Sequence, residues 1–192
     1  MTTIGDVALD ELDAAAAARF GEDVLRVYAA AMMPPPYSKS IADVQMFAGT
    51  YERHLERSGF RMFVARRDGQ IVGYTYGYRS VPGTWWRDHV AEALGPQRSR
   101  EWLTDAFEFA ELAVSPQHRR AGIGSALHDA LLDGVGTRTS VLSTLEEDTA
   151  GSNLYEKKGW RTLLDDFWFT NTAVPYRVMG IELEGLMRSR AG

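Results

Sequence analysis

The stretch Arg119-Arg120-Ala121-Gly122-Ile123-Gly124 lies between a strand-like run and a helix-like run, and it indicates the fold. Before it, residues 107–114 (FEFAELAV) are rich in apolar and aromatic side chains. After it, residues 125–132 (SALHDALL) repeat apolar side chains at helical spacing. A strand that turns through a glycine-rich loop into a helix directs several unpaired backbone N–H groups at one point, where the helix dipole adds positive potential. The pattern therefore predicts a binding site for phosphate.

Two familiar phosphate-binding loops do not fit this spacing. A nucleotide-hydrolysing loop ends in Gly-Lys followed by Ser or Thr, whereas Gly124 is followed directly by Ser125. A dinucleotide-binding fold needs a third glycine three residues after the second, and that position is Leu127. Both exclusions argue against a nucleotide-binding regulatory domain and leave Arg-x-x-Gly-x-Gly as the motif to explain.

This motif resembles the acyl-CoA loop of the GCN5-related N-acetyltransferases, the GNAT family. Upstream, Leu112–Pro116 (LAVSP) is similar to the strand end that precedes the family's loop. Downstream, Leu154–Trp160 (LYEKKGW) resembles the family's Leu-Tyr-Glu-Lys-x-Gly-Phe segment, with a strand pattern at Val141–Leu145 in between. The resemblance implies an α/β (α+β) fold: a central, twisted, mixed but mostly antiparallel sheet flanked by helices, with a helical insertion before the fourth strand. It also implies acetyl-CoA as the acyl-donor substrate.

Length and composition place the chain among ordinary globular proteins. Its 192 residues fit one domain, so we expect a single GNAT domain over residues 1–192. No apolar run approaches the ~18 residues of a membrane-spanning helix, and the N-terminus lacks the basic and apolar parts of a secretory signal. A cytoplasmic location is the simplest interpretation. With no cysteine, the chain has no disulfides, thiolate metal sites or cysteine nucleophiles.

The net charge and the spacing of the histidines argue against two classes of ligand, nucleic acids and metal ions. A net charge of −5 argues against a general nucleic-acid binder and mildly favours a cationic acceptor. The histidines show no metal-ligand spacing, so we expect no metal site. The preference for arginine over lysine, with many alanines and glycines, suggests a GC-rich bacterial genome.

Hydrophobic periodicity predicts the elements around the motifs. Helices are expected over residues 10–33, 41–57, 87–93, 98–105, 122–132 and 149–158. Strands are expected over residues 61–67, 70–78, 107–114, 140–145, 161–170 and 177–183. Pro34-Pro35-Pro36 ends the first helix because proline removes the amide donor and fixes φ. The alanine tract inside that helix could instead be a partly disordered arm.

Aromatic residues concentrate in two segments of unassigned role. Residues 83–106 hold Trp85, Trp86 and Trp102 among charged side chains, and such a segment either covers a core or lines a ligand pocket. In the GNAT family acceptor-contacting insertions occur here, so we expect a helical insertion near the acceptor site. Aromatic residues near the C-terminus could line a homodimer interface or complete the core: Phe167, Trp168, Phe169 and Tyr176.

The resemblance implies binding roles around the loop. The pyrophosphate would be bound mostly by main-chain N–H groups of Arg119, Arg120, Ala121, Gly122, Ile123, Gly124 and Ser125. The backbone of Leu112 and Val114 would pair with pantetheine, and the Val114 N–H would face the acetyl oxygen as an oxyanion hole. Asp148 stands where the family often has a pantetheine-contacting asparagine, and a carboxylate cannot donate that hydrogen bond.

Glu108 and Glu111 are the candidates for the proton acceptor. Glu108 lies six residues before Val114, which matches the general base of the histone-acetyltransferase branch. Strand alternation puts Glu108 on the face of Ala110 and Leu112 and Glu111 on the opposite face, so only one faces the active cleft unless a bulge intervenes. Deprotonation through a water chain, without a dedicated base, is the alternative.

Tyr155 matches the family's tyrosine that protonates the departing thiolate, with packing against Leu154 and Trp160 as its alternative role. The sequence therefore predicts an acetyl-CoA-dependent N-acetyltransferase. It would act on a primary amine of a small-molecule acceptor, by direct attack in a ternary complex. A protein or peptide amine acceptor, or a CoA-binding sensor without turnover, are the alternatives.

Overall fold

The computed structural model describes residues 2–170 and 172–183. The chain divides into two compact units, each made of two stretches of sequence. The first unit comprises residues 1–78 and 110–133, and the second comprises residues 79–109 and the chain from Gly134 onward. Strand β5 (Ala106–Val114) belongs to both, since it passes from the second unit into the first at Ala110.

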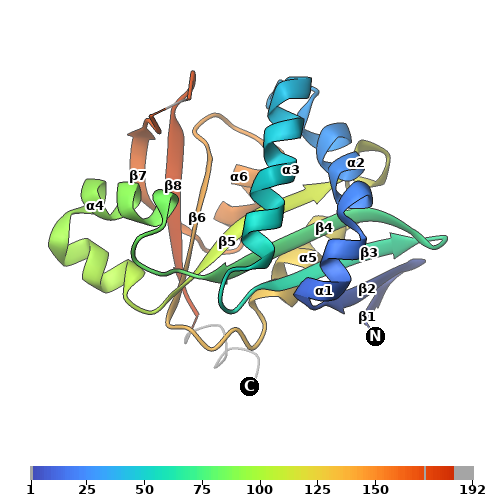
Figure 1. Cartoon of the computed structure of the whole chain (residues 1–192), viewed down its shortest axis with the longest axis horizontal. Coiled ribbons are helices and arrows are strands. Elements are labelled where there is room, and N and C mark those ends of the chain that lie inside the picture. The colour runs from blue at the N-terminus through green and yellow to red at the C-terminus, as the bar shows by residue number, and fades with distance from the viewer. Residues whose placement is uncertain (1, 171, 184–192) are drawn as a thin grey trace. The chain divides into compact units, whose positions relative to one another are not determined.

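The first unit is a sheet with helices on both faces (Figure 1). Its strand order is β1-β2-β3-β4-β5, with β1 paired to β2, β2 to β3 and β3 to β4 in antiparallel register. The strands are β1 (Thr2–Ile4), β2 (Val7–Leu12), β3 (Arg61–Arg67) and β4 (Gln70–Arg79). The helices are α1 (Ala14–Arg19), α2 (Gly21–Met32), α3 (Ile41–Leu55), the short 3-10 helix η1 (Pro116–His118) and α5 (Ile123–Leu132).

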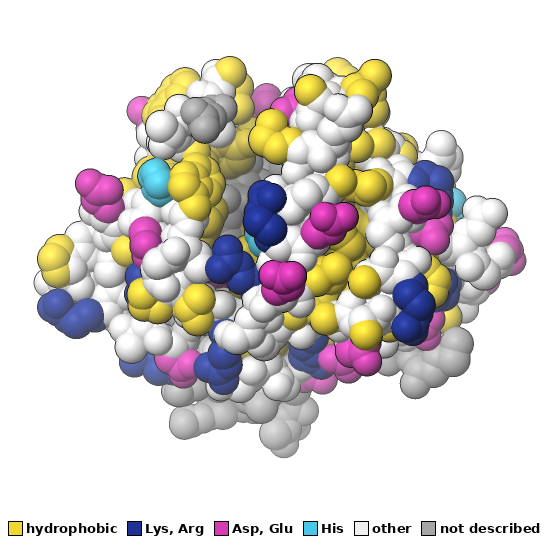
Figure 2. Space-filling model, viewed as in Figure 1, with side chains coloured by type: hydrophobic (Ala, Val, Ile, Leu, Met, Phe, Trp, Pro, Cys, Tyr) yellow, Lys and Arg dark blue, Asp and Glu magenta, His cyan; other side chains and the backbone are white. Residues whose placement is uncertain are grey.

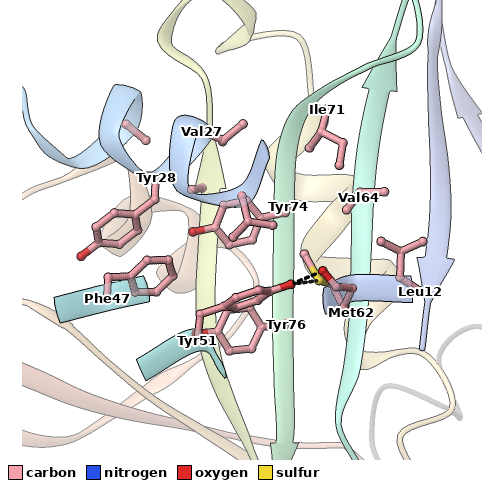
Figure 3. Packing of buried hydrophobic residues seen from close by; sticks show 14 of the residues in the cluster. Leu12, Val27, Tyr28, Phe47, Tyr51, Met62, Val64, Ile71, Tyr74 and Tyr76 are labelled. Atoms are coloured by element: carbon pink, nitrogen blue, oxygen red, sulfur yellow. Dashed lines mark hydrogen bonds between the residues drawn. The ribbon is translucent and has the colours of Figure 1, made fainter. Parts of the chain in front are cut away.

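Strand alternation explains why this sheet is covered twice. On β3, Met62 and Val64 join a cluster with residues of α1, α2 and α3, which Figure 3 shows from close by. Phe63 and Ala65 belong instead to a second cluster that includes α5. Each face of the sheet therefore buries its own apolar layer, and the helices on both sides are held by hydrophobic burial.

The helix predicted over residues 10–33 is wrong in two respects. Residues up to Leu12 form strand β2, and α1 starts only after Asp13, whose side chain accepts the Ala16 N–H at 2.7 Å. The helix is then interrupted at Phe20, which caps α1 and precedes α2. Asp13 is a good N-cap residue and was the available signal for the true start.

The second unit is a sheet in the order β5-β6-β8-β7 with two helices. Strand β6 (Thr139–Leu145) runs parallel to β5, while β8 (Tyr176–Glu182) pairs antiparallel with both β6 and β7 (Arg161–Phe167). Helix α4 (Trp85–Leu103) packs on β6 and β7, and α6 (Ala150–Lys157) packs on β6. Gly95, with a φ of 73°, interrupts α4 just before Pro96, so the two helical pieces expected in this segment are present.

These observations confirm the predicted fold class: a mixed, mostly antiparallel sheet flanked by helices, with a helical segment before β5. No helix within the described ranges is long and apolar enough to cross a bilayer. On the face shown in Figure 2, acidic and basic side chains are interspersed, so the described residues there form no extended basic patch.

Candidate active site

The glycine-rich loop forms a cradle at the start of α5, within the first unit. Ser115 N–H donates to Val72 O at 2.8 Å, which fixes the chain as it leaves β5. Arg120 and Gly122 then take left-handed conformations, with φ of 68° and 80°. Gly122 caps α5, and a Cβ built on it would meet no atom within 4 Å, so the space beside the loop is open. First-turn N–H groups of a helix have no intrahelical partner, so this geometry fits an anionic ligand such as a pyrophosphate.

The two loop arginines lie in different environments. The Arg119 guanidinium donates to two main-chain carbonyls, Val114 O at 3.3 Å and Ala31 O at 3.1 Å. Both arginines are exposed, but within residues 2–170 and 172–183 the Arg120 side chain makes no hydrogen bond or ion pair. Arg119 is therefore engaged by the protein, whereas the guanidinium of Arg120 is available to a ligand.

Glu111 lies on the β5 segment that leads to the cradle, and its side chain is half-buried. Burial raises the pKa of Glu111 from 4.5 to about 7, although the Leu112 N–H and the positive charge of Lys39 both favour the carboxylate. The negative charge of Glu111 in turn helps to raise the pKa values of Tyr74 and Tyr76 on β4. Because that pKa is close to neutrality, Glu111 can take up and release a proton under ordinary conditions.

Simple alternation, which would put Ala110 and Leu112 on one face of β5, does not hold, and the bulge left open by the sequence analysis fits instead. Ala110 packs against the cluster formed with α1, α2 and α3, whereas Leu112 packs against the cluster that includes α5. The alternation is therefore interrupted between these two residues, as a β-bulge would do. Ala113, two residues beyond Glu111, belongs to the same cluster as Ala110.

A row of tyrosines on β4 is a feature that the sequence interpretation missed. Tyr74, Tyr76 and Tyr78 all belong to the cluster beneath α2 and α3. The two ring nitrogens of His54 bond to Tyr76 Oη at 3.1 Å and to Tyr78 Oη at 3.2 Å. Burial lowers the pKa of His54 to about 4, so its neutral ring donates through one nitrogen and accepts through the other. The signal available was three tyrosines spaced two apart on one strand.

Tyr74 is the exceptional member of this row. It is fully buried, and its hydroxyl is among the few buried polar atoms in the described part of the chain that lack a hydrogen-bond partner. Figure 3 shows its ring directed from β4 towards Tyr28 and Phe47, whose rings stack at 3.8 Å between centroids. A buried hydroxyl without a hydrogen-bond partner costs about 1–3 kcal/mol of stability. The Tyr74 hydroxyl is therefore a candidate to form a hydrogen bond with a polar group that enters this part of the protein.

The other predicted catalytic residues belong to the second unit. Glu108 is buried, and its carboxylate accepts a hydrogen bond from the Ser80 hydroxyl at 2.8 Å. Tyr155 is also buried, and its ring packs edge-to-face against Phe109 and Trp160 at 5.8 and 5.7 Å. Asp148 is exposed between β6 and α6. The packing role considered for Tyr155 is thus present, while its role as a proton donor stays a prediction.

The tryptophans of the insertion divide between packing and exposure. Trp102 is buried in the core of the second unit, and Trp86 Nε1 donates to Ser143 Oγ at 3.0 Å. Trp85 is 54% exposed and lies against His89 and Phe169. Trp168 is exposed as well, so the predicted dimer interface has one candidate residue outside the core.

The structure thus brings Glu111, Leu112, Val114 and the loop Arg119–Ser125 into one unit, and Glu108, Asp148 and Tyr155 into the other. Within the described ranges no group of three or more His, Asp or Glu residues could hold a metal ion.

Comparison with known proteins identifies the family. The sequence model described as "Acetyltransferase (GNAT) domain" matches residues 58–162, more than half of the chain. The chain belongs to the GNAT acetyltransferase family. A GCN5-like protein acetyltransferase of Mycobacterium tuberculosis is 27% identical to it over 152 residues, which cover 74% of this chain and 73% of that protein.

Solved GNAT structures show the same fold. A GNAT-family acetyltransferase from Desulfovibrio desulfuricans superposes with a TM-score of 0.65 at 16% identity, over 92% of this chain and 99% of that one. The PaiA N-acetyltransferase of Thermoplasma acidophilum, crystallised with coenzyme A, gives 0.60 at 13% identity, over 92% and 98%. As a GNAT protein, the chain is an N-acetyltransferase that uses acetyl-CoA.

Proposed function

We propose that this GNAT enzyme transfers the acetyl group of acetyl-CoA directly to a primary amine of a small-molecule acceptor. The observation that carries the proposal is Glu111, a half-buried carboxyl with a pKa of about 7 on the strand that leads into the glycine-rich loop. Direct transfer needs a base for the amine, and a base with a pKa near neutrality is well matched to that task. We further propose that both units form one catalytic domain, because the family match runs through residues of both.

The reaction can be written with the residues in named roles. Glu111 takes a proton from the ammonium form of the acceptor, and the free amine attacks the thioester carbon. Negative charge on the acetyl oxygen is stabilised by the Val114 N–H as the tetrahedral intermediate forms. When the carbon–sulfur bond breaks, the thiolate leaves and Tyr155 supplies the proton that makes it the CoA thiol. The nitrogen of the new amide then gives up its second proton, which restores the Tyr155 hydroxyl. The first-turn amides of α5 and Arg120 hold the pyrophosphate.

Glu111 is preferred over Glu108 as the base for a specific reason. The Glu108 carboxylate already accepts the Ser80 hydroxyl. The charge of Glu111 instead acts on Tyr74 and Tyr76, and the Tyr74 hydroxyl is without a partner. A carboxylate whose charge acts on two aromatic side chains suits an organic ammonium ion.

A protein amine is the second candidate acceptor, because the Mycobacterium relative is a protein acetyltransferase by name. The small-molecule and protein acceptors are distinguished by measuring release of the CoA thiol from acetyl-CoA in the presence of each candidate amine. The candidates are polyamines, amino acids, aminoglycosides, short peptides and folded basic proteins. The absence of cysteine removes any thiol background from the enzyme itself. Release with small amines alone supports the proposal, release with peptides or proteins alone supports the second candidate, and CoA binding without release refutes both.

A further inference from the structure

The last turn of α2 lacks its usual hydrogen-bond donors. The carbonyls of Ala30, Ala31 and Met32 would be paired by N–H groups four residues later, but those positions are Pro34, Pro35 and Pro36. Proline has no N–H, so all three carbonyls need partners from elsewhere. Lys39 N–H supplies one for Met32 O, at 2.9 Å.

Arg119 supplies the partner for Ala31. Ala31 is 3% exposed, so an unpaired carbonyl there would be costly, and Arg119 Nη2 donates to it at 3.1 Å across 88 positions of sequence. The positive guanidinium also lies at the carboxyl end of the helix, where the dipole favours a cation. Arg119 Nε meanwhile donates to Val114 O at the end of β5. One side chain at the start of the glycine-rich loop therefore joins that loop to β5 and to α2.

The segment that follows α2 carries a positive charge that acts on the proposed base. Residues 33–40 connect α2 to α3, where Ser40 caps α3 in a capping box with Asp43. The Lys39 N–H bonds back to Met32 O, and the charge of Lys39 acts on Glu111. The position of this connection is thus tied both to the last turn of α2 and to the surroundings of Glu111.

We propose that Arg119 is a positioning residue that couples binding of acetyl-CoA at the glycine-rich loop to the conformation of residues 33–40. The inference rests on the proposed function, since it assigns the loop to the CoA pyrophosphate and the face of Glu111 to the acceptor. Arg119 then acts through Ala31 O and Val114 O, and the phosphate ligands are the loop amides and Arg120.

Hydrogen exchange of the intact protein, with and without saturating CoA, tests this coupling directly. In the wild type, CoA should slow exchange both in peptides that cover residues 120–126 and in peptides that report Tyr37, Ser38 and Lys39, the latter by about 5-fold or more. In Arg119→Gln, protection should remain at residues 120–126 and be lost at residues 37–39. The CoA Kd of this variant should stay within about 3-fold of the wild type, because loop amides supply the contacts.

Arg120→Gln is the matched control, since it removes the same charge from the neighbouring position. At saturating CoA it should keep protection at residues 37–39. If Arg119→Gln does not fold, Arg119→Lys gives the same comparison, because a single ammonium cannot donate in the geometry of Nε and Nη2 together.

Three results would overturn the coupling. The first is that CoA still protects residues 37–39 in Arg119→Gln. The second is that CoA protects the loop but not residues 37–39 in the wild type. The third is that Arg119→Gln raises the CoA Kd about 30-fold and Arg119→Lys restores it. The last would make Arg119 a direct phosphate ligand. Failure of CoA to bind the wild type at all would refute the proposed function instead, so the two failures are distinguishable.

Discussion

Replacing Glu111 by glutamine should stabilise the protein and inactivate it, and the stabilisation should depend on pH. The carboxyl has an ordinary pKa of 4.5 and a folded-state pKa of about 7, because burial disfavours the charged form. A tenfold change in a proton-binding constant corresponds to about 1.4 kcal/mol, so ionising Glu111 in the folded protein costs about 3.5 kcal/mol at most, and about 2 kcal/mol if water reaches the half-buried carboxylate.

The direction in which stability changes with pH follows from the number of protons bound in the folded and unfolded states. Between pH 4.5 and about 7 the folded state holds a proton that the unfolded state has released. The stability contributed by protonated Glu111 is therefore fully present below pH 4.5 and is lost as the pH rises through about 7. Glutamine is neutral throughout and its oxygen can still accept the Leu112 N–H. Glu111→Gln should thus differ from wild type by under about 1 kcal/mol at pH 5 and be about 2–3 kcal/mol more stable at pH 8.

Urea denaturation at pH 5, 6, 7 and 8 measures this difference through the free energy of unfolding. Glu111 interacts electrostatically with Tyr74, Tyr76 and Lys39, and none of these three is changed in the variant. Glu52→Gln, which removes an exposed carboxylate from α3, controls for the loss of one negative charge. A stability difference between Glu111→Gln and wild type that stays flat from pH 5 to pH 8 would refute the burial argument.

The same variant tests catalysis. Wild-type kcat/KM should rise with pH up to about 7 and then level off, because only the carboxylate form of Glu111 accepts a proton. In Glu111→Gln this limb should disappear, with turnover reduced about 10²-fold to 10⁴-fold. Wild-type turnover in the variant would remove Glu111 from the mechanism and leave Glu108 or a water chain as the route for the proton.

Three further predictions concern single side chains. Tyr155→Phe should lower kcat by about 10-fold or more while the CoA Kd from calorimetry stays unchanged; full turnover would leave Tyr155 with its packing role alone. Gly124→Asp should raise the CoA Kd by about 100-fold or more, since it places a negative charge at the pyrophosphate site, and tight binding by a folded variant would locate the cradle elsewhere. Gly180→Ala should lower the free energy of unfolding by about 1–3 kcal/mol, because its Cβ would lie 2.6 Å from Trp102 Cε3; an unchanged thermal midpoint would contradict this packing.

The elements with strong local signals were predicted closely from the sequence. Strand β3 has the predicted bounds, α3 begins at residue 41 as predicted, with Ser40 as its cap, and the helix after the glycine-rich loop starts at its glycine cap. In each case the information is local: alternation, a capping serine, or a glycine that takes a positive φ. The first two strands were missed because Val7, Leu9 and Leu12 precede an alanine tract whose helix propensity dominates the window.

The site was predicted less completely, for a physical reason. Motif positions identify residue types, but the partner of a long side chain depends on tertiary structure. The contact between Arg119 and Ala31 O and the unpaired hydroxyl of Tyr74 depend on segments far apart in sequence. The resemblance implied a phosphate-binding role for Arg119 mostly through its main-chain N–H, and that role stays a prediction; it gave no indication that the guanidinium donates to main-chain carbonyls of β5 and α2.

The discontinuous make-up of the two units has a consequence for synthesis of the chain. The ribosome completes residues 1–78 well before residues 110–133, yet both stretches are needed for the first unit. Until Val114 has emerged, β4 lacks the β5 segment beside it and presents a free strand edge, the kind of surface that pairs with other chains. The aromatic layer beneath α2 and α3 can close on its own during that interval, but the edge cannot. Rapid translation of residues 79–133, or a chaperone that covers β4, would shorten the nascent chain's exposure to aggregation.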